Sequence, residues 1–400
     1  MSFRRVSAVF LTAMMTFSCT AYGAGLASIS SANPNAITPV VEVTEEEVPA
    51  RVITYNEAVE MAIKNNSSLR TLEDNLEKLQ ETEEDLGMAL SMVGMPGVPG
   101  MPTGHTYYID STTATILTSL NTVQNSINTV EDSKEITEAA CELTVKNYMN
   151  AIISGENNYA MMIDNLEISR ATTHFNRIKY DLGMISLTEF NKALNDNKNV
   201  EYTVKLTKLA LDTAYNNLGN IIGLNDGQKF VIDYSVVYEE YPEQMNLNTF
   251  ANKLADASPT LKIADRKVDD AEFNKKVVAV DNGTSLEERN RNLEAAGREY
   301  NDTRNGLLLA VRNGYITVKQ AEANIETLKL TLADTQKQYD NAVISHSLGY
   351  ITDVELAGAK LGLTKAENDV ETAIMNHDLA KFMLDHPYLS TSSSTQQKQQ

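Results

Sequence analysis

An internal duplication constrains this 400-residue chain more than any other feature of its sequence. Residues 180–224 align with residues 346–389 without a gap, at an offset of 166 positions. The openings of the two copies also match, at an offset of 192, which places Asn56 on Asn248. Order and spacing agree at once, so the chain is predicted to fold as two equivalent halves. The aligned pairs include Leu182 with Leu348, Gly183 with Gly349, Ile185 with Ile351, Ser186 with Thr352 and Glu189 with Glu355.

The two offsets differ because the first half carries about 26 additional residues in its middle. Residues 88–113 hold the Gly/Pro/Met-rich run and have no counterpart later in the chain. The predicted organisation is a first repeat at 55–224 with an insert at 88–113, a linker at 225–246 and a second repeat at 247–389. Alternating β-branched and aromatic residues at 228–238 predict one short strand in the linker.

Both halves show the periodicity of long paired helices. Apolar residues recur at alternating steps of three and four, which places one seam along a helix that must meet another helix. Long helices are expected near 114–181 and 285–346, the first about 100 Å long at 1.5 Å per residue. The fold class is therefore mostly all-α. A plain extended coiled coil satisfies the same pattern. The seams are Ile116, Leu120, Val123, Ile127 and Val130; Val311, Tyr315 and Val318; and Leu328, Leu332, Thr335, Tyr339 and Ala342.

Composition supports helices and disfavours one class of partner. Trp is absent and only 9 Pro and 19 Gly occur, which is unlike a β-protein with many tight turns. The formal net charge of −20 repels nucleic-acid phosphates, so a nucleic-acid-binding role is disfavoured.

The N-terminal segment has the pattern of a secretory signal. Arg4 and Arg5 precede an uncharged, mostly apolar run, and small residues allow cleavage after Gly23, giving a signal peptide at 1–23. Cleavage after Ala27 fits nearly as well. Lipidation at Cys19 is a further alternative, although the residues before Cys19 match the lipoprotein signal poorly. Residues 24–54 are predicted to be an extended leader and 390–400 a disordered tail. No later stretch is long and apolar enough to span a membrane as a helix, so the mature chain is expected to be exported.

Two equivalent turns are the candidate functional residues. A Gly after a long helix can adopt a left-handed conformation and end it. Ser186 or Thr352 can then cap the next helix, with Glu189 or Glu355 completing a capping box. Two ordinary helix hairpins, without a functional role, are equally compatible with these residues. The turns comprise Leu182, Gly183, Met184, Ile185 and Ser186, and Leu348, Gly349, Tyr350, Ile351 and Thr352.

With these motifs in order and in duplicate, residues 55–389 resemble the TolC-like outer-membrane efflux proteins. The opening run from Tyr55 to Leu69 resembles the family's first helix, and the two turns resemble its Gly-x-aliphatic-Ser/Thr tip motif. The resemblance implies a homotrimeric tube of helices that serves as the passive exit duct of an efflux or type I secretion assembly. It further implies that the tips dock a membrane-fusion-type adaptor linked to an inner-membrane pump, and that the location is the outer membrane. No cofactor is expected from the residues.

The chain departs from the family where strands are expected. Family members insert two membrane strands in each repeat, and a spanning strand needs about 9–11 residues. Residues 281–285 hold only a turn, and Pro96, Pro99 and Pro102 remove ladder donors from the first-half insert. The membrane barrel strands are therefore predicted to be missing or reduced, which places outer-membrane insertion in doubt.

The insert itself is a candidate membrane or partner loop. It carries no charged residue from Leu86 to Ile109 if His105 is neutral, and its methionines are adaptable apolar contacts. A flexible loop is the simpler interpretation, and three collagen-type triplets at 94–102 are a further one. The residues concerned are Met92, Met95, Pro96, Val98, Pro99, Met101 and Pro102.

The sequence gives no support for a catalytic or metal-binding site. The five His residues are scattered and lack metal-ligand spacing, and no phosphate loop or nucleophile elbow is present. The chain is therefore expected to be no enzyme and to hold no metal. The alternative to a duct is a structural coiled-coil protein of the cell envelope, a spacer or adhesin without transport activity.

Overall fold

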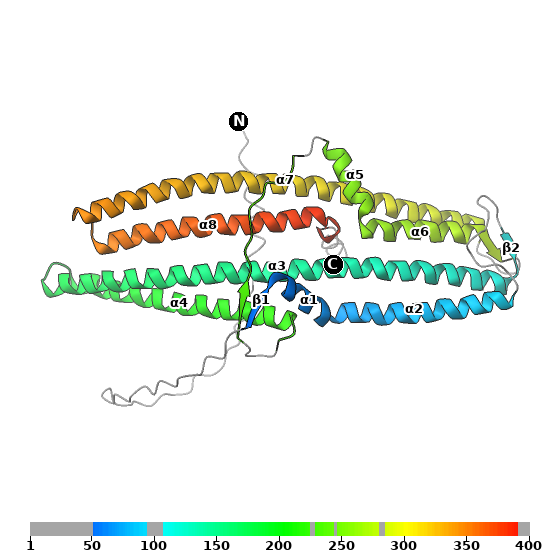
Figure 1. The fold of residues 1–400 in the computed structure, drawn as a ribbon, viewed down its shortest axis with the longest axis horizontal. Coiled ribbons are helices and arrows are strands. Elements are labelled where there is room, and N and C mark those ends of the chain that lie inside the picture. Colours follow the sequence, from blue (N-terminus) through cyan, green and yellow to red (C-terminus); the bar gives the residue numbers. More distant parts are fainter. Residues whose placement is uncertain (1–50, 94–106, 225–228, 244–245, 280–284, 391–400) are drawn as a thin grey trace, which may run out of the picture. The chain divides into compact units, whose positions relative to one another are not determined.

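A computed structural model describes residues 51–93, 107–224, 229–243, 246–279 and 285–390 (Figure 1). The predicted signal peptide, most of the leader, and the insert between Gly94 and Thr106 lie outside these ranges. The elements of the first half are β1 (Arg51–Thr54), α1 (Tyr55–Asn65), α2 (Ser67–Met92), β2 (Tyr107–Ile109), α3 (Ser111–Asp181) and α4 (Leu187–Ile221). Those that follow are β3 (Phe230–Asp233), α5 (Leu247–Ala257), α6 (Pro259–Lys276), β4 (Val277–Ala279), α7 (Leu286–Ser347) and α8 (Asp353–Asp385).

The two long helices confirm the periodicity argument. Helix α3 has 71 residues and α7 has 62, and each begins and ends within three residues of its predicted bounds. Helix α3 packs on α2 along its first part and on α4 along its last part, while α7 packs on α6 and then on α8 (Figure 1). The same order of long and short helices therefore occurs twice, as the duplication predicts.

Each repeat opens with a helix break that the sequence analysis did not predict. The expected block at 55–88 is two helices, because Asn66 interrupts α1 and caps α2 by accepting hydrogen bonds from the backbone of Ser68 and Leu69, at 2.8 and 3.1 Å. Ser258, the position equivalent to Asn66 at the offset of 192, separates α5 from α6, and Pro259 follows at the first position of α6. Asn and Pro both favour the start of a helix over its interior, which explains the paired breaks.

A short parallel sheet joins the start of the first repeat to the linker. Strand β1 pairs with β3 in the register Arg51 to Phe230 through Thr54 to Asp233. The strand predicted within 228–238 is confirmed, whereas the last four residues of the predicted leader are ordered as β1. Burial explains this correction, because Ile53 is fully buried in the core of the first repeat.

A second pair of strands takes one strand from each repeat. Strand β2 lies between α2 and α3 in the chain, and β4 lies between α6 and α7. Strand β2, within the predicted insert, pairs in parallel with β4, which ends just before the predicted turn at 281–285. Each strand is three residues long, and the sequence analysis predicted neither. Across the described ranges, no helix combines the length and the apolar character needed to cross a membrane.

The cores are narrow seams between paired helices. In the first repeat, Val145, Met149 and Ile152 of α3 are buried with Leu218 of α4. In the second repeat, Val311 and Val318 of α7 pack with Leu384 of α8 and Ala251 of α5. The predicted seam on the later part of α7 is half-buried, as two-helix contact requires.

Candidate docking surface at the hairpin tips

The α3–α4 turn is closed by backbone hydrogen bonds that leave little freedom. Gly183 has φ of 71°, its N–H donates to Tyr180 O at 2.8 Å, and the N–H of Met184 donates to Lys179 O at 2.8 Å. These two bonds make a Schellman motif, which satisfies the last carbonyls of α3. Nothing lies within 4 Å of a Cβ placed on Gly183, so the glycine is required by its backbone conformation alone.

The α7–α8 turn repeats this geometry. Gly349 has φ of 76°, its N–H donates to His346 O at 2.9 Å, and the N–H of Tyr350 donates to Ser345 O at 2.9 Å. Open space surrounds Gly349 as well. The predicted left-handed glycines are thus confirmed at both tips.

Capping boxes fix the helices that return from each turn, as predicted. The hydroxyl of Ser186 accepts from the backbone N–H of Glu189, whose carboxylate accepts from the N–H of Ser186 at 2.7 Å. Thr352 and Glu355 make the same pair of bonds, with 2.8 Å between the N–H of Thr352 and the carboxylate. These backbone hydrogen bonds, with those from the hydroxyls, lower the pKa of both Glu189 and Glu355.

Side chains around the turns add local rigidity. The rings of Tyr180 and Phe190 stack across the first hairpin with centroids 5.3 Å apart. At the second hairpin, Nε2 of His346 lies 2.7 Å from Oδ1 of Asp353. This contact joins the end of α7 to the start of α8.

Four apolar side chains stand in solvent at the tips. Their exposed fractions are 70% for Leu182, 68% for Met184, 63% for Leu348 and 80% for Tyr350. Such exposure on rigid turns is typical of a binding surface. Ile185 and Ile351, in contrast, are half-buried. Each precedes an N-cap residue, a position whose side chain often turns back toward the first turn of the helix.

Both tips lie at the same end of the helices (Figure 1). A groove of about 260 Å³ runs between the tip-proximal parts of α3 and α8, lined by Asp164, Glu167, Asp353 and Lys360 with apolar residues between them. Helix α2, which contains Met92, ends beside the start of α3, at the other end of this 71-residue helix from the tip. Of the residues of the candidate loop, Met92 ends α2 and is 85% exposed, whereas Met95, Pro96, Val98, Pro99, Met101 and Pro102 lie outside the described residues.

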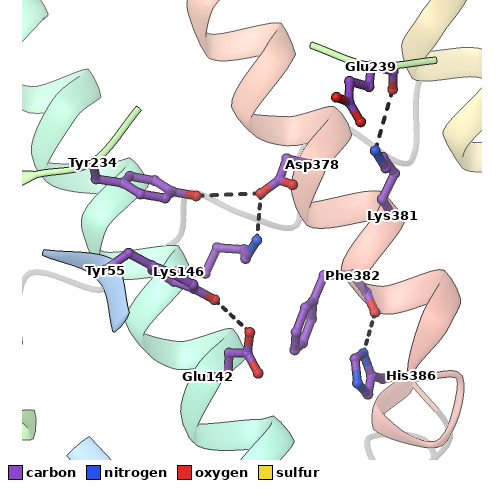
Figure 2. A network of polar contacts seen from close by, with 9 residues as sticks. All are labelled: Tyr55, Glu142, Lys146, Tyr234, Glu239, Asp378, Lys381, Phe382 and His386. Carbon is purple, nitrogen blue, oxygen red and sulfur yellow. Dashed lines mark hydrogen bonds and ion pairs between the residues drawn. The ribbon is translucent and has the colours of Figure 1, made fainter. Parts of the chain in front are cut away.

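A buried polar network between the repeats escaped sequence reasoning (Figure 2). Nζ of Lys146 on α3 lies 2.6 Å from Oδ2 of Asp378 on α8, and the hydroxyl of Tyr234 is 3.5 Å from the same oxygen. Tyr55 donates to Glu142 at 2.8 Å and stacks on Tyr234. Burial, with this bond to Glu142, raises the pKa of Tyr55. In the sequence, the only sign of this network is the charged Lys146 beside the apolar residues Val145 and Met149. That sign does not identify Asp378, 232 residues away, as the partner of Lys146.

The arrangement described above is the fold of the TolC-like outer-membrane channels, as the sequence resemblance predicted. Among solved structures, the chain is similar to the Campylobacter jejuni CmeC outer membrane channel, with 14% identity, a TM-score of 0.57, and 83% of this chain and 84% of that one covered. It is also similar to the outer membrane protein VceC from Vibrio cholerae, at 12% identity and a TM-score of 0.53 over 84% and 95% of the two chains. Similarity to CusC gives 10% identity and a TM-score of 0.59 over 83% and 91%.

At such low identity these comparisons establish the fold alone. No sequence-family profile and no curated protein matches the chain.

Proposed function

We propose that this protein is the passive exit duct of an efflux or secretion assembly in the cell envelope. The observation that carries the proposal is the pair of equivalent, rigidly capped tips that expose Met184 and Tyr350 at one end of a channel-type fold. Solved structures with this fold, CmeC among them, are described as outer membrane channels. Within the described residues, no group of side chains is suited to hold a metal ion.

The duct would be a homotrimer, because α7 carries an apolar stripe that the described residues leave uncovered. Leu309, Ile316, Leu330 and Ile344 are spaced by seven or fourteen residues and are 49–71% exposed. The first two lie two residues before buried Val311 and Val318, which places the stripe on the opposite face from the packed seam. We call these four residues the α7 stripe. A heptad spacing fits a partner helix, and a second copy of this chain supplies helices of matching length.

The tips would dock a periplasmic adaptor of the membrane-fusion type. Tyr350 is the strongest candidate anchor, because aromatic side chains dominate the energetics of interfaces. Ser186 and Thr352 would set the angle of the returning helices, and Leu182 and Leu348 would widen the apolar contact. The acidic groove between α3 and α8 lies beside this surface and would favour basic side chains on the partner.

Substitution at the tips tests this function. In cells, Met184→Ala with Tyr350→Ala should abolish export while the purified protein still forms trimers in native mass spectrometry. Val237→Ala is the matched control, because Val237 is 78% exposed in the linker away from the tips, and it should leave export unchanged. A photo-crosslinking residue at position 350 should capture an adaptor that mass spectrometry identifies.

Imaging of single particles separates the duct from a structural envelope protein. A threefold hollow assembly supports the duct, whereas solid fibres or single chains favour the spacer. If export is untouched by the tip variant, or if trimers dissociate, the docking assignment is wrong.

A further inference from the structure

The segment that joins the two repeats lies against the second repeat as a strap. Residues 234–241, here called the strap, follow β3 and contact α7 and α8. The hydroxyl of Tyr234 approaches Asp378, and Nζ of Lys381 donates to the carbonyl of Glu239 at 3.5 Å (Figure 2). Tyr241, at the far end, donates from its hydroxyl to Oδ1 of Asp385 at 3.0 Å.

Glu322 of α7 holds the strap by its backbone. Its Oε1 accepts from the N–H of Tyr241 at 2.7 Å, and its Oε2 accepts from Nζ of Lys319 at 2.8 Å. Lys319 also donates to the carbonyl of Tyr241 at 2.7 Å. One carboxylate and one ammonium group thus fix both backbone polar groups of Tyr241.

His377 of α8 is buried beneath the strap beside this carboxylate. It is 1% exposed, and the ring of Tyr238 covers it edge to face with centroids 5.2 Å apart. Its Nε2 lies 3.5 Å from Oε1 of Glu322, the oxygen that already accepts from Tyr241. Within the described residues, this Nε2 and the hydroxyl of Tyr238 have no hydrogen-bond partner.

Charged and titratable groups surround His377 on each element packed against it. Helix α7 contributes Glu322 and Lys319, the strap contributes Tyr238, and α8 itself contributes Asp378 and Lys381. Helix α3 contributes Lys146, which is paired with Asp378. Burial lowers the pKa of His377, although Glu322 acts in the opposite direction, so the packed imidazole is neutral at pH 7.

We propose that His377 and Glu322 form a pH-sensitive clasp, in which acid protonates His377 and releases the strap from α7 and α8. A neutral imidazole packs under Tyr238, whereas an imidazolium in the same place carries an unsolvated charge and competes with Tyr241 for Oε1 of Glu322. A released strap exposes His377 to water, where it titrates near its ordinary value of 6.5. The closed state binds protons less well than the open one, so closure is complete above that value and is lost as the pH falls below it.

Release would remove one of the attachments between the two halves of the chain. Tyr234 belongs to the core of the first repeat, and Tyr241 packs on the core of the second. The strap is the covalent connection between them, and its attachment to α7 and α8 adds to the direct packing of α3 on α6 and α8. This proposal is independent of the docking role of the tips.

Hydrogen exchange of the full-length protein tests the clasp. Peptides covering 235–241 are followed by mass spectrometry between pH 7.5 and 5.0, with exchange times scaled for the intrinsic pH dependence. In the wild type, protection should fall about tenfold over this range, because an exposed imidazole gains a proton that the buried one does not. His377→Gln, which cannot titrate, should show the same protection at both pH values.

Three further variants complete the test. Glu322→Gln should weaken protection of Tyr241 at every pH, because a neutral amide oxygen is a poorer acceptor than a carboxylate. His174→Gln, which removes an exposed His from α3, should retain the wild-type pH dependence. His377→Phe keeps an aromatic ring under Tyr238 and serves if His377→Gln fails to fold. The proposal is overturned if the wild type shows no loss of protection, or if the folded His377 variant loses protection with acid as the wild type does.

Discussion

Lys146 of α3 and Asp378 of α8 form a largely buried ion pair, with 2.6 Å between Nζ and Oδ2, that joins the first repeat to the second. The ammonium group also lies 5.3 Å from the ring centroid of Tyr55 and 5.4 Å from that of Phe382. Lys146 itself is only 8% exposed. The pair therefore fixes the register of two helices that are distant in sequence.

Removal of the Lys146 ammonium should destabilise the fold. We expect Lys146→Met to lower the free energy of unfolding by about 2 kcal/mol, because it leaves a partly buried carboxylate without its cation. Lys134→Met is the matched control on the same helix. It breaks an exposed pair with Glu73 and should cost less than about 1 kcal/mol. Chemical denaturation followed by circular dichroism measures both values, and equal costs would contradict the assigned role.

Substitution by alanine should destabilise the protein at a left-handed glycine and stabilise it at a glycine inside a helix. Gly349→Ala should cost about 1 kcal/mol or more, because φ of 76° strains any side chain although the space is open. Gly358→Ala, in the interior of α8 with equally open space, should stabilise by up to about 1 kcal/mol. The two melting temperatures decide the matter, and a shift of the same sign in both would refute the argument.

Acid should loosen the first turns of α4 and α8. The folded-state pKa of Glu189 and of Glu355 is lowered, so the stability they contribute is present above the ordinary value of 4.5 and is lost as the pH falls through the folded value. Hydrogen exchange of 186–190 and 352–356 between pH 6 and 3 should show this loss. The start of α2 provides an internal control, because Asn66 caps it and does not titrate in this range. Equal loss at all three helix starts would rule out the capping carboxylates as its cause.

A charge on the α7 stripe should weaken self-association. Leu330→Glu places a carboxylate on a surface that is 71% exposed in the single chain and would be buried in the trimer. We expect the trimer to dissociate at a protein concentration at least about tenfold higher than in the wild type. Gln338→Glu, at an exposed position of α7 outside the stripe, also adds a negative charge and should leave assembly intact. Analytical ultracentrifugation distinguishes these outcomes.

Local sequence determined the helices, their duplication and their ends. Alternating steps of three and four residues specify α3 and α7, and the Gly and Ser/Thr-x-x-Glu signals at 183–189 and 349–355 specify both tips, because these interactions join residues at most a few positions apart. The paired breaks at Asn66 and Ser258 follow equally local preferences, although the analysis did not predict them.

Only the tertiary structure decided what those helices bring together. Lys146 meets Asp378, β1 meets β3, and His377 is buried under Tyr238, in each case across 139 to 232 positions of sequence. Periodicity marks the face of a helix that will be covered, but it does not specify which helix covers it or at what register. Those choices depend on the packing of many side chains at once, and so the pairing of the repeats and the polar network were determined by the fold as a whole.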